Sequence, residues 1–158
     1  MNSPISSDKN IKSWRKAARG RLRLELAGLS FALSKGFSPE DYARHLWGKG
    51  ALNWIKKTRP GAAEYLLKEA RAFQEFYPEV VFEVVETGDE KAELVFTGGC
   101  LGGWGRDHWA VARSLGLTQQ DICAYCGEAF RVWAEPLGLD VSIGPENGAN
   151  CRLRVTRH

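Results

Sequence analysis

The period of the hydrophobic pattern changes half-way along the chain, and this change constrains the fold more than any other feature. In the first half, apolar residues recur at steps of three and four, which is the spacing of one face of an α-helix. The second half adds stretches in which apolar and polar residues alternate, as they do in half-buried strands. The chain has 158 residues, the length of one domain. The sequence therefore predicts a single α+β domain.

The first half contains three predicted helices. An unbroken apolar stripe predicts the first helix over about 10–35. The segment 38–41 begins the second, because a Ser cap, a Pro at the first helical position and acids in the first turn all favour a helix start. The third helix is amphipathic over 63–73.

The second half contains two predicted hairpins joined by helices. The hairpin strands are expected at 79–86 with 91–97 and at 139–143 with 151–156, around a turn at 144–148, and the helices at about 106–115 and 118–135. The order ααα–ββ–αα–ββ predicts one antiparallel sheet of about four strands with helices on one face. We divide the single domain 1–158 into a disordered start (1–9), a helical part (10–77) and an α+β part with the cysteines (79–157).

Composition excludes several classes of protein. Hydrophobic residues make up 44% and charged residues 26%, so a mainly disordered chain is excluded. No apolar run is long enough to span a membrane, and the start lacks the apolar segment of a secretory signal. We therefore expect a cytoplasmic protein, and a homodimer stays open.

The charge distribution is uneven. Residues 1–23 hold seven of the 22 basic residues and one acid, which leaves 15 basic and 18 acidic residues for the rest. A basic start suits contact with nucleic acid or an anionic membrane, although a solvated helix face, or one docked on the domain's own acidic side, is the favoured alternative. No nucleic acid is expected to bind the main, acidic part.

Four cysteines, Cys100, Cys123, Cys126 and Cys151, fall near the C-terminus. A helix would point Cys123 and Cys126 to one side, and the last strand would place Cys151 on its core face. Since Cys100 follows a strand, the four thiols could converge. They suit a zinc ion or an iron–sulfur cluster, and a redox or catalytic thiol and plain burial stay open as alternatives.

A glycine-rich loop over 98–108 contains or precedes further candidates for catalysis and ligand binding. It is not a phosphate loop, because it lacks the Gly-Lys-Ser/Thr ending and the dinucleotide glycine spacing. Asp107 and His108 are candidates for proton transfer, with a surface or capping role as the alternative for His108. The residues predicted to line an apolar substrate pocket, with core packing as the alternative, are Trp104, Trp109 and Tyr125.

Four segments together resemble the L-2-amino-thiazoline-4-carboxylic acid hydrolase-like family: Thr97–Cys100, Ala112–Leu117, Cys123–Cys126 and Gly148–Arg154. They are more distantly similar to the 4-vinyl reductase domain, which closes with a comparable Gly-x-x-x-Cys strand. The resemblance covers about residues 95–156. It implies an α+β ligand-handling fold with an enclosed small-molecule pocket.

The two families imply different site chemistry. The hydrolase family implies water addition to a cyclic amidine carbon, which opens a thiazoline ring. The 4-vinyl reductase type implies a zinc ion held by cysteines and a glutamate. Cys151 matches one of those cysteines and either Cys123 or Cys126 the other, while Glu146 lies near the turn expected for the glutamate.

Two hypotheses of function follow. The favoured one is a hydrolase acting on a C–N bond of a small cyclic substrate, with Cys100 or a metal-bound water as nucleophile and His108 or Asp107 transferring the proton. The alternative is a non-enzymatic ligand-binding, sensor or carrier domain with a structural zinc site, or an iron–sulfur protein.

Overall fold

The computed structural model describes residues 7–55, 59–76, 80–98, 108–147 and 150–158. Its elements in chain order are α1 (Ser7–Ser34), α2 (Pro39–Ile55), α3 (Ala62–Phe76), β1 (Val81–Glu86), β2 (Lys91–Thr97), α4 (His108–Ser114), α5 (Gln119–Ala134), a 3-10 turn (Glu135–Leu137), β3 (Leu139–Glu146) and β4 (Asn150–Arg157). This order confirms the α+β prediction.

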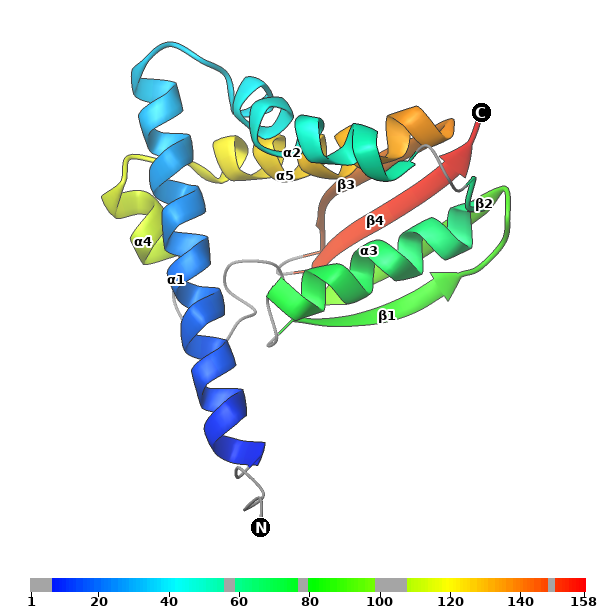
Figure 1. Ribbon diagram of the computed structural model, residues 1–158, viewed down its shortest axis with the longest axis horizontal. Coiled ribbons are helices and arrows are strands. Elements are labelled where there is room, and N and C mark those ends of the chain that lie inside the picture. The colour runs from blue at the N-terminus through cyan, green and yellow to red at the C-terminus, as the bar shows by residue number, and fades with distance from the viewer. Residues whose placement is uncertain (1–6, 56–58, 77–79, 99–107, 148–149) are drawn as a thin grey trace.

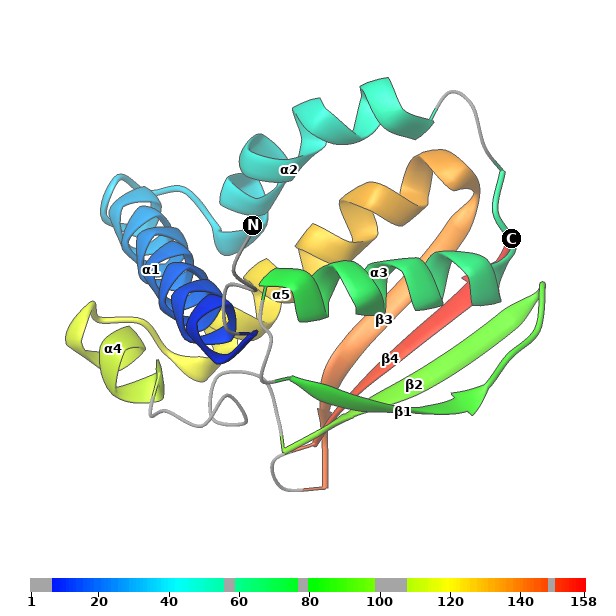
Figure 2. The same ribbon diagram turned by 60° about the horizontal axis from the view of Figure 1, so that its bottom comes forward.

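The four strands form one antiparallel sheet in the order β1-β2-β4-β3. Both hairpins pair locally, and β4 then joins them by pairing with β2. Helix α3 packs over β2 and β4, α5 packs over β3, and α2 lies on α5. Figures 1 and 2 show these helices on one face of the sheet, as predicted, with α1 and α4 at one end.

Local signals set several helix ends. Thr118 and Asp121 form a capping box at the start of α5: the Asp121 amide donates to Thr118 Oγ1 at 3.2 Å, and the Thr118 amide donates to the Asp121 carboxylate at 2.8 Å. Ser38 and Asp41 exchange the same pair of bonds at α2, each at 3.0 Å. Gly36 ends the α1 segment with φ +83°, a conformation that glycine adopts without steric cost.

Several boundaries differ from the prediction by a few residues, and two of these differences change the description of a segment. Helix α1 begins at Ser7, inside the segment 1–9 that we expected to be disordered. Strand β3 continues to Glu146, so most of the predicted turn 144–148 is strand. Proline is compatible with this position because β3 is an edge strand, and an edge strand can place a residue without an amide proton where it faces away from the sheet.

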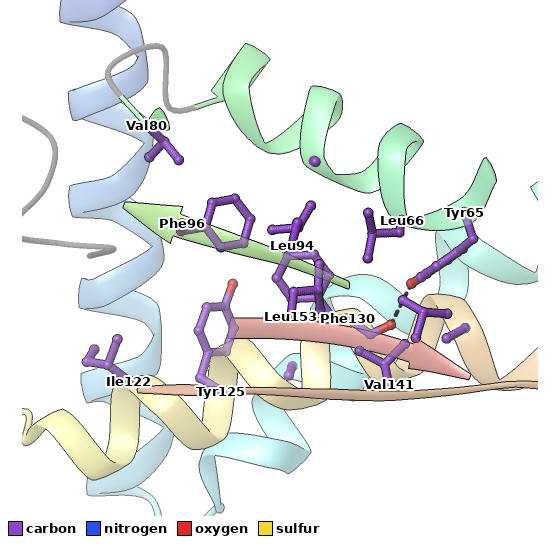
Figure 3. Close-up of a cluster of buried hydrophobic side chains, with 14 of the residues drawn as sticks. Tyr65, Leu66, Val80, Leu94, Phe96, Ile122, Tyr125, Phe130, Val141 and Leu153 are labelled. Carbon is purple, nitrogen blue, oxygen red and sulfur yellow. Dashed lines mark hydrogen bonds between the residues drawn. The ribbon is translucent and has the colours of Figure 1, made fainter. Parts of the chain in front are cut away.

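The hydrophobic core lies between the sheet and the helices that cover it. Leu94 and Leu153 pair on the inner face of β2 and β4, beneath Leu66 of α3, and all three are fully buried. Figure 3 shows these side chains together with the hydroxyl of Tyr65, which donates to the carbonyl oxygen of Phe130 at 2.8 Å. Among the described helices, none has the length and hydropathy needed to cross a bilayer.

Candidate functional site

A small apolar cavity lies where the first half of α5 passes over the ends of β2, β3 and β4. Its volume is about 20 Å³, and its lining is almost wholly apolar. We name it the cysteine cavity after three of its lining residues. The lining consists of Phe73, Phe96, Ile122, Cys123, Cys126, Ile143, Gly144 and Cys151.

The register of the sheet builds the floor of the cysteine cavity. Cys151 of β4 pairs with Phe96 of β2 on one side and with Pro145 of β3 on the other. Alternation along β4 puts Cys151 on the same face as Leu153 and Val155, which are both fully buried. The sequence prediction that Cys151 faces the core is therefore confirmed.

The roof of the cavity comes from α5 and α3. Cys123 and Cys126 are three residues apart on α5 and both line the cavity, as helical spacing predicts. Phe73 of α3 closes one side, with its ring centroid 5.2 Å from that of Phe96. Three thiols from one helix and one strand thus border a single space.

The thiol of Cys123 is kept neutral by its surroundings. Burial raises the pKa of Cys123 above its ordinary value, because a thiolate loses hydration in an apolar environment. A protonated thiol is a poor nucleophile and a poor metal ligand. At Cys123 the cavity therefore presents a polarisable apolar group to whatever enters it.

The predicted metal site is wrong. Among the residues that the structure describes, no group of three or more His, Cys, Asp or Glu side chains is arranged to hold a metal ion. Cys123, Cys126 and Cys151 line one cavity, yet among the described residues they do not form a ligand set. Neither zinc nor an iron–sulfur cluster is supported, and Cys100 lies outside the described residues.

The predicted proton-transfer residues are not brought to the cavity by the described structure. His108 is the first residue of α4, is 2% exposed and does not line the cysteine cavity. Asp107 lies outside the described residues. Their catalytic roles, and catalysis by this chain in general, stay predictions.

The predicted pocket aromatics lie elsewhere than the cavity lining. Tyr125 is buried, and its hydroxyl accepts a hydrogen bond from Trp47 Nε1 at 3.0 Å. Its ring lies 5.5 Å from that of Tyr42, so it joins α5 to α2. Trp109 is partly buried against the core, and Trp104 lies outside the described residues. Ligand binding by these three stays a prediction.

Sequence reasoning missed other residues that the fold brings together. Phe73, Ile122 and Ile143 carry only the general signal of apolar periodicity, which does not separate a cavity wall from the rest of the core. Glu128 of α5 is another such residue: it is 2% exposed and forms ion pairs with Arg44 of α2 and with Arg131.

Known proteins show little similarity to this chain. No protein-family model matches the chain, and no curated protein matches it. Two solved structures are similar: the Fe(II) unliganded H-NOX protein from K. algicida and a mutant of it, at 11% and 10% identity. Each match covers 80% of this chain and 67% of the other, with a TM-score of 0.43. A TM-score of 0.43 does not establish a shared fold.

These results correct the family assignment. The resemblance to the thiazoline hydrolase-like family and to the 4-vinyl reductase domain is wrong, since no family model or curated relative supports it. The C–N hydrolase prediction came from that resemblance and is wrong with it, as is the sensor or carrier with a structural zinc site, which also requires a ligand set that the described residues lack. The Glu146 ligand role is likewise removed, and Glu146 pairs with Arg152 at 2.7 Å.

Proposed function

We propose that this chain is a binding domain for a small, uncharged, apolar molecule, and that the molecule binds in the cysteine cavity. The observation that carries the proposal is the character of the lining. Among the residues that the structure describes, four hydrocarbon side chains, three thiols and one glycine line the space, and none of them is charged. Specificity then comes from shape and from the polarisable sulfur atoms.

The size of the cavity limits the ligand. A space of about 20 Å³ holds roughly one water-sized probe, and a water needs polar partners that this lining does not offer. An apolar site of this size favours only the smallest apolar ligands. A larger ligand requires movement of the long side chains, such as Phe73 and Ile143.

Xenon is a suitable probe because it is uncharged, apolar and small. We expect xenon to shift the NMR signals of the Ile122 and Ile143 methyl groups. Cys151→Ala enlarges the cavity and should strengthen xenon binding several-fold, because a larger apolar space accommodates the atom with less strain. Cys151→Leu fills the space and should abolish the shifts.

The matched control is Ser142→Ala, an exposed position on the neighbouring strand β3. It should leave xenon binding unchanged. The proposal fails if the wild-type chain and Cys151→Ala show no xenon-dependent shifts at either isoleucine, or if Cys151→Leu shows the same shifts as the wild type. Unfolding curves for each variant separate loss of binding from loss of fold.

A further inference from the structure

Helix α1 carries a second apolar face that the fold does not use. Its inner face is buried in the body through Leu22, Leu26 and Leu29. Its opposite face exposes Leu24 (75% exposed) and Phe31 (65% exposed) to solvent. The exposed positions recur at steps of three and four, and we name them the outer stripe: Ala17, Gly20, Leu24, Ala27 and Phe31.

A row of basic residues follows the outer stripe along the same helix. Its members also recur at steps of three and four, and we name it the basic row: Lys9, Lys12, Lys16, Arg19 and Arg23. The row extends about 21 Å along the helix axis. Lys16 and Arg23 lie four residues before Gly20 and Ala27, so the row and the stripe are neighbours on the helix surface.

The outer stripe is not needed to hold α1 in place. Inward contacts fix the helix: Ser30 Oγ donates to the carbonyl oxygen of Leu115 at 2.6 Å, and Trp14 Nε1 donates to that of Glu75 at 2.8 Å. Figure 1 shows α1 along one side of the molecule, with its N-terminal half projecting beyond the sheet. The outer face is therefore available to a partner.

We propose that α1 docks on an anionic lipid bilayer through the outer stripe and the basic row. Leu24 and Phe31 would enter the boundary between headgroups and acyl chains, where a helix with one apolar and one basic side lies in the plane of the interface. The basic row would contact the lipid phosphates, which attract Lys and Arg near the surface. This docking is independent of the ligand proposed for the cysteine cavity.

The outer stripe and the basic row lie side by side, and this arrangement favours a lipid bilayer over a nucleic acid or a second copy of the chain. A nucleic acid would contact the basic row alone and would leave exposed Leu24 and Phe31 unused. A second copy of the chain could cover the stripe. However, the only acid between residues 9 and 35 is Glu25, which is buried and paired with Arg21 at 2.7 Å, so this stretch of the helix offers no exposed acid to the basic row of another copy.

Vesicle flotation tests the proposal with the whole chain. We expect the protein to float with vesicles of phosphatidylcholine and phosphatidylglycerol, not with phosphatidylcholine alone, and binding should weaken as salt screens the charges. Leu24→Ser with Phe31→Ser should weaken binding at least tenfold. Lys12→Gln, Lys16→Gln and Arg23→Gln together should have a similar effect.

The matched control is Val81→Ser with Val85→Ser, which removes two exposed apolar side chains from β1 and should leave flotation unchanged. Flotation that is equal for all variants, or absent for the wild type, overturns the proposal. Self-association that Leu24→Ser with Phe31→Ser abolishes, without vesicle binding, assigns the stripe to a second copy. Heparin retention that depends only on the basic row, again without vesicle binding, assigns the row to nucleic acid.

Discussion

The hydroxyl of Tyr42 occupies the space that a side chain on Gly28 would need. A Cβ atom added at Gly28 would lie 2.2 Å from Tyr42 Oη. Tyr42 cannot move away freely, because its hydroxyl donates to the carbonyl oxygen of Glu25 at 3.4 Å and its ring packs against Tyr125. The missing side chain at Gly28 is what lets α1 and α2 approach each other.

Gly28→Ala should therefore destabilise the protein by about 1–3 kcal/mol, the usual range for overpacking. Gly20→Ala on the same helix is the matched control, since a Cβ there meets nothing within 4 Å. That change should stabilise the protein by about 0.5–1 kcal/mol, because alanine is the better helix former. Urea unfolding measures both, and equal shifts in one direction would contradict the packing argument.

Removal of the Tyr65 hydroxyl should also lower stability. Tyr65→Phe deletes a buried hydrogen bond of 2.8 Å to the carbonyl oxygen of Phe130, and we expect a loss of about 1 kcal/mol in the free energy of unfolding. Tyr42→Phe removes a longer, part-buried bond of 3.4 Å and should have a smaller effect. A larger loss of stability for Tyr42→Phe than for Tyr65→Phe would contradict the view that the hydrogen bond between α3 and α5 is a main stabilising contact.

The ion pairs of Glu128 should respond asymmetrically to mutation. Arg44→Gln with Arg131→Gln leaves a buried carboxylate without its cations, and we expect a loss of about 3–5 kcal/mol. Glu128→Gln should cause a smaller loss, because the two arginine side chains are 52% and 50% exposed and can turn to water. Thermal and urea unfolding compare the two variants, and a larger loss for Glu128→Gln would contradict this account.

Stability should depend on pH through Glu69 of α3. Burial raises the pKa of Glu69 from 4.5 to about 7, and Lys68 offsets only part of that effect. The folded state then binds a proton more tightly than the unfolded state, so this contribution to stability is lost as pH rises from about 4.5 through 7.

Glu69→Gln should remove this pH dependence. At about pH 8 the variant should be more stable than the wild type by roughly 2 kcal/mol, and the two should converge near pH 4. Glu64→Gln, at an exposed position of the same helix, is the control and should leave the pH profile unchanged. Parallel stability curves for Glu69→Gln and the wild type would contradict the argument.

Local signals predicted the elements well. The capping hydrogen bonds at Ser38 and Thr118 each join residues that are three positions apart, so the helix starts could be predicted from the sequence alone. Alternation along 151–156 likewise fixed the inward face of Cys151, because a strand's side chains have a period of two. The continuation of β3 through Pro145 was missed, since it depends on whether that strand lies at an edge of the sheet.

The site could not be predicted to the same extent. Short cysteine motifs suggested a metal centre, but ligation depends on angles and distances among residues from α5 and β4 that no spacing encodes. The burial of Glu128 depended on Arg44, which lies in another helix 84 positions earlier in the chain.

By itself, the sequence determined the order of helices and strands, the inward face of the last strand and the basic character of α1, because these follow from neighbours along the chain. Only the tertiary structure decided that β4 pairs with β2, that three thiols border one apolar cavity, and that Leu24 and Phe31 face solvent. The physical reason is that pairing, cavities and exposure arise between segments far apart in the chain, where packing rather than local preference selects the arrangement.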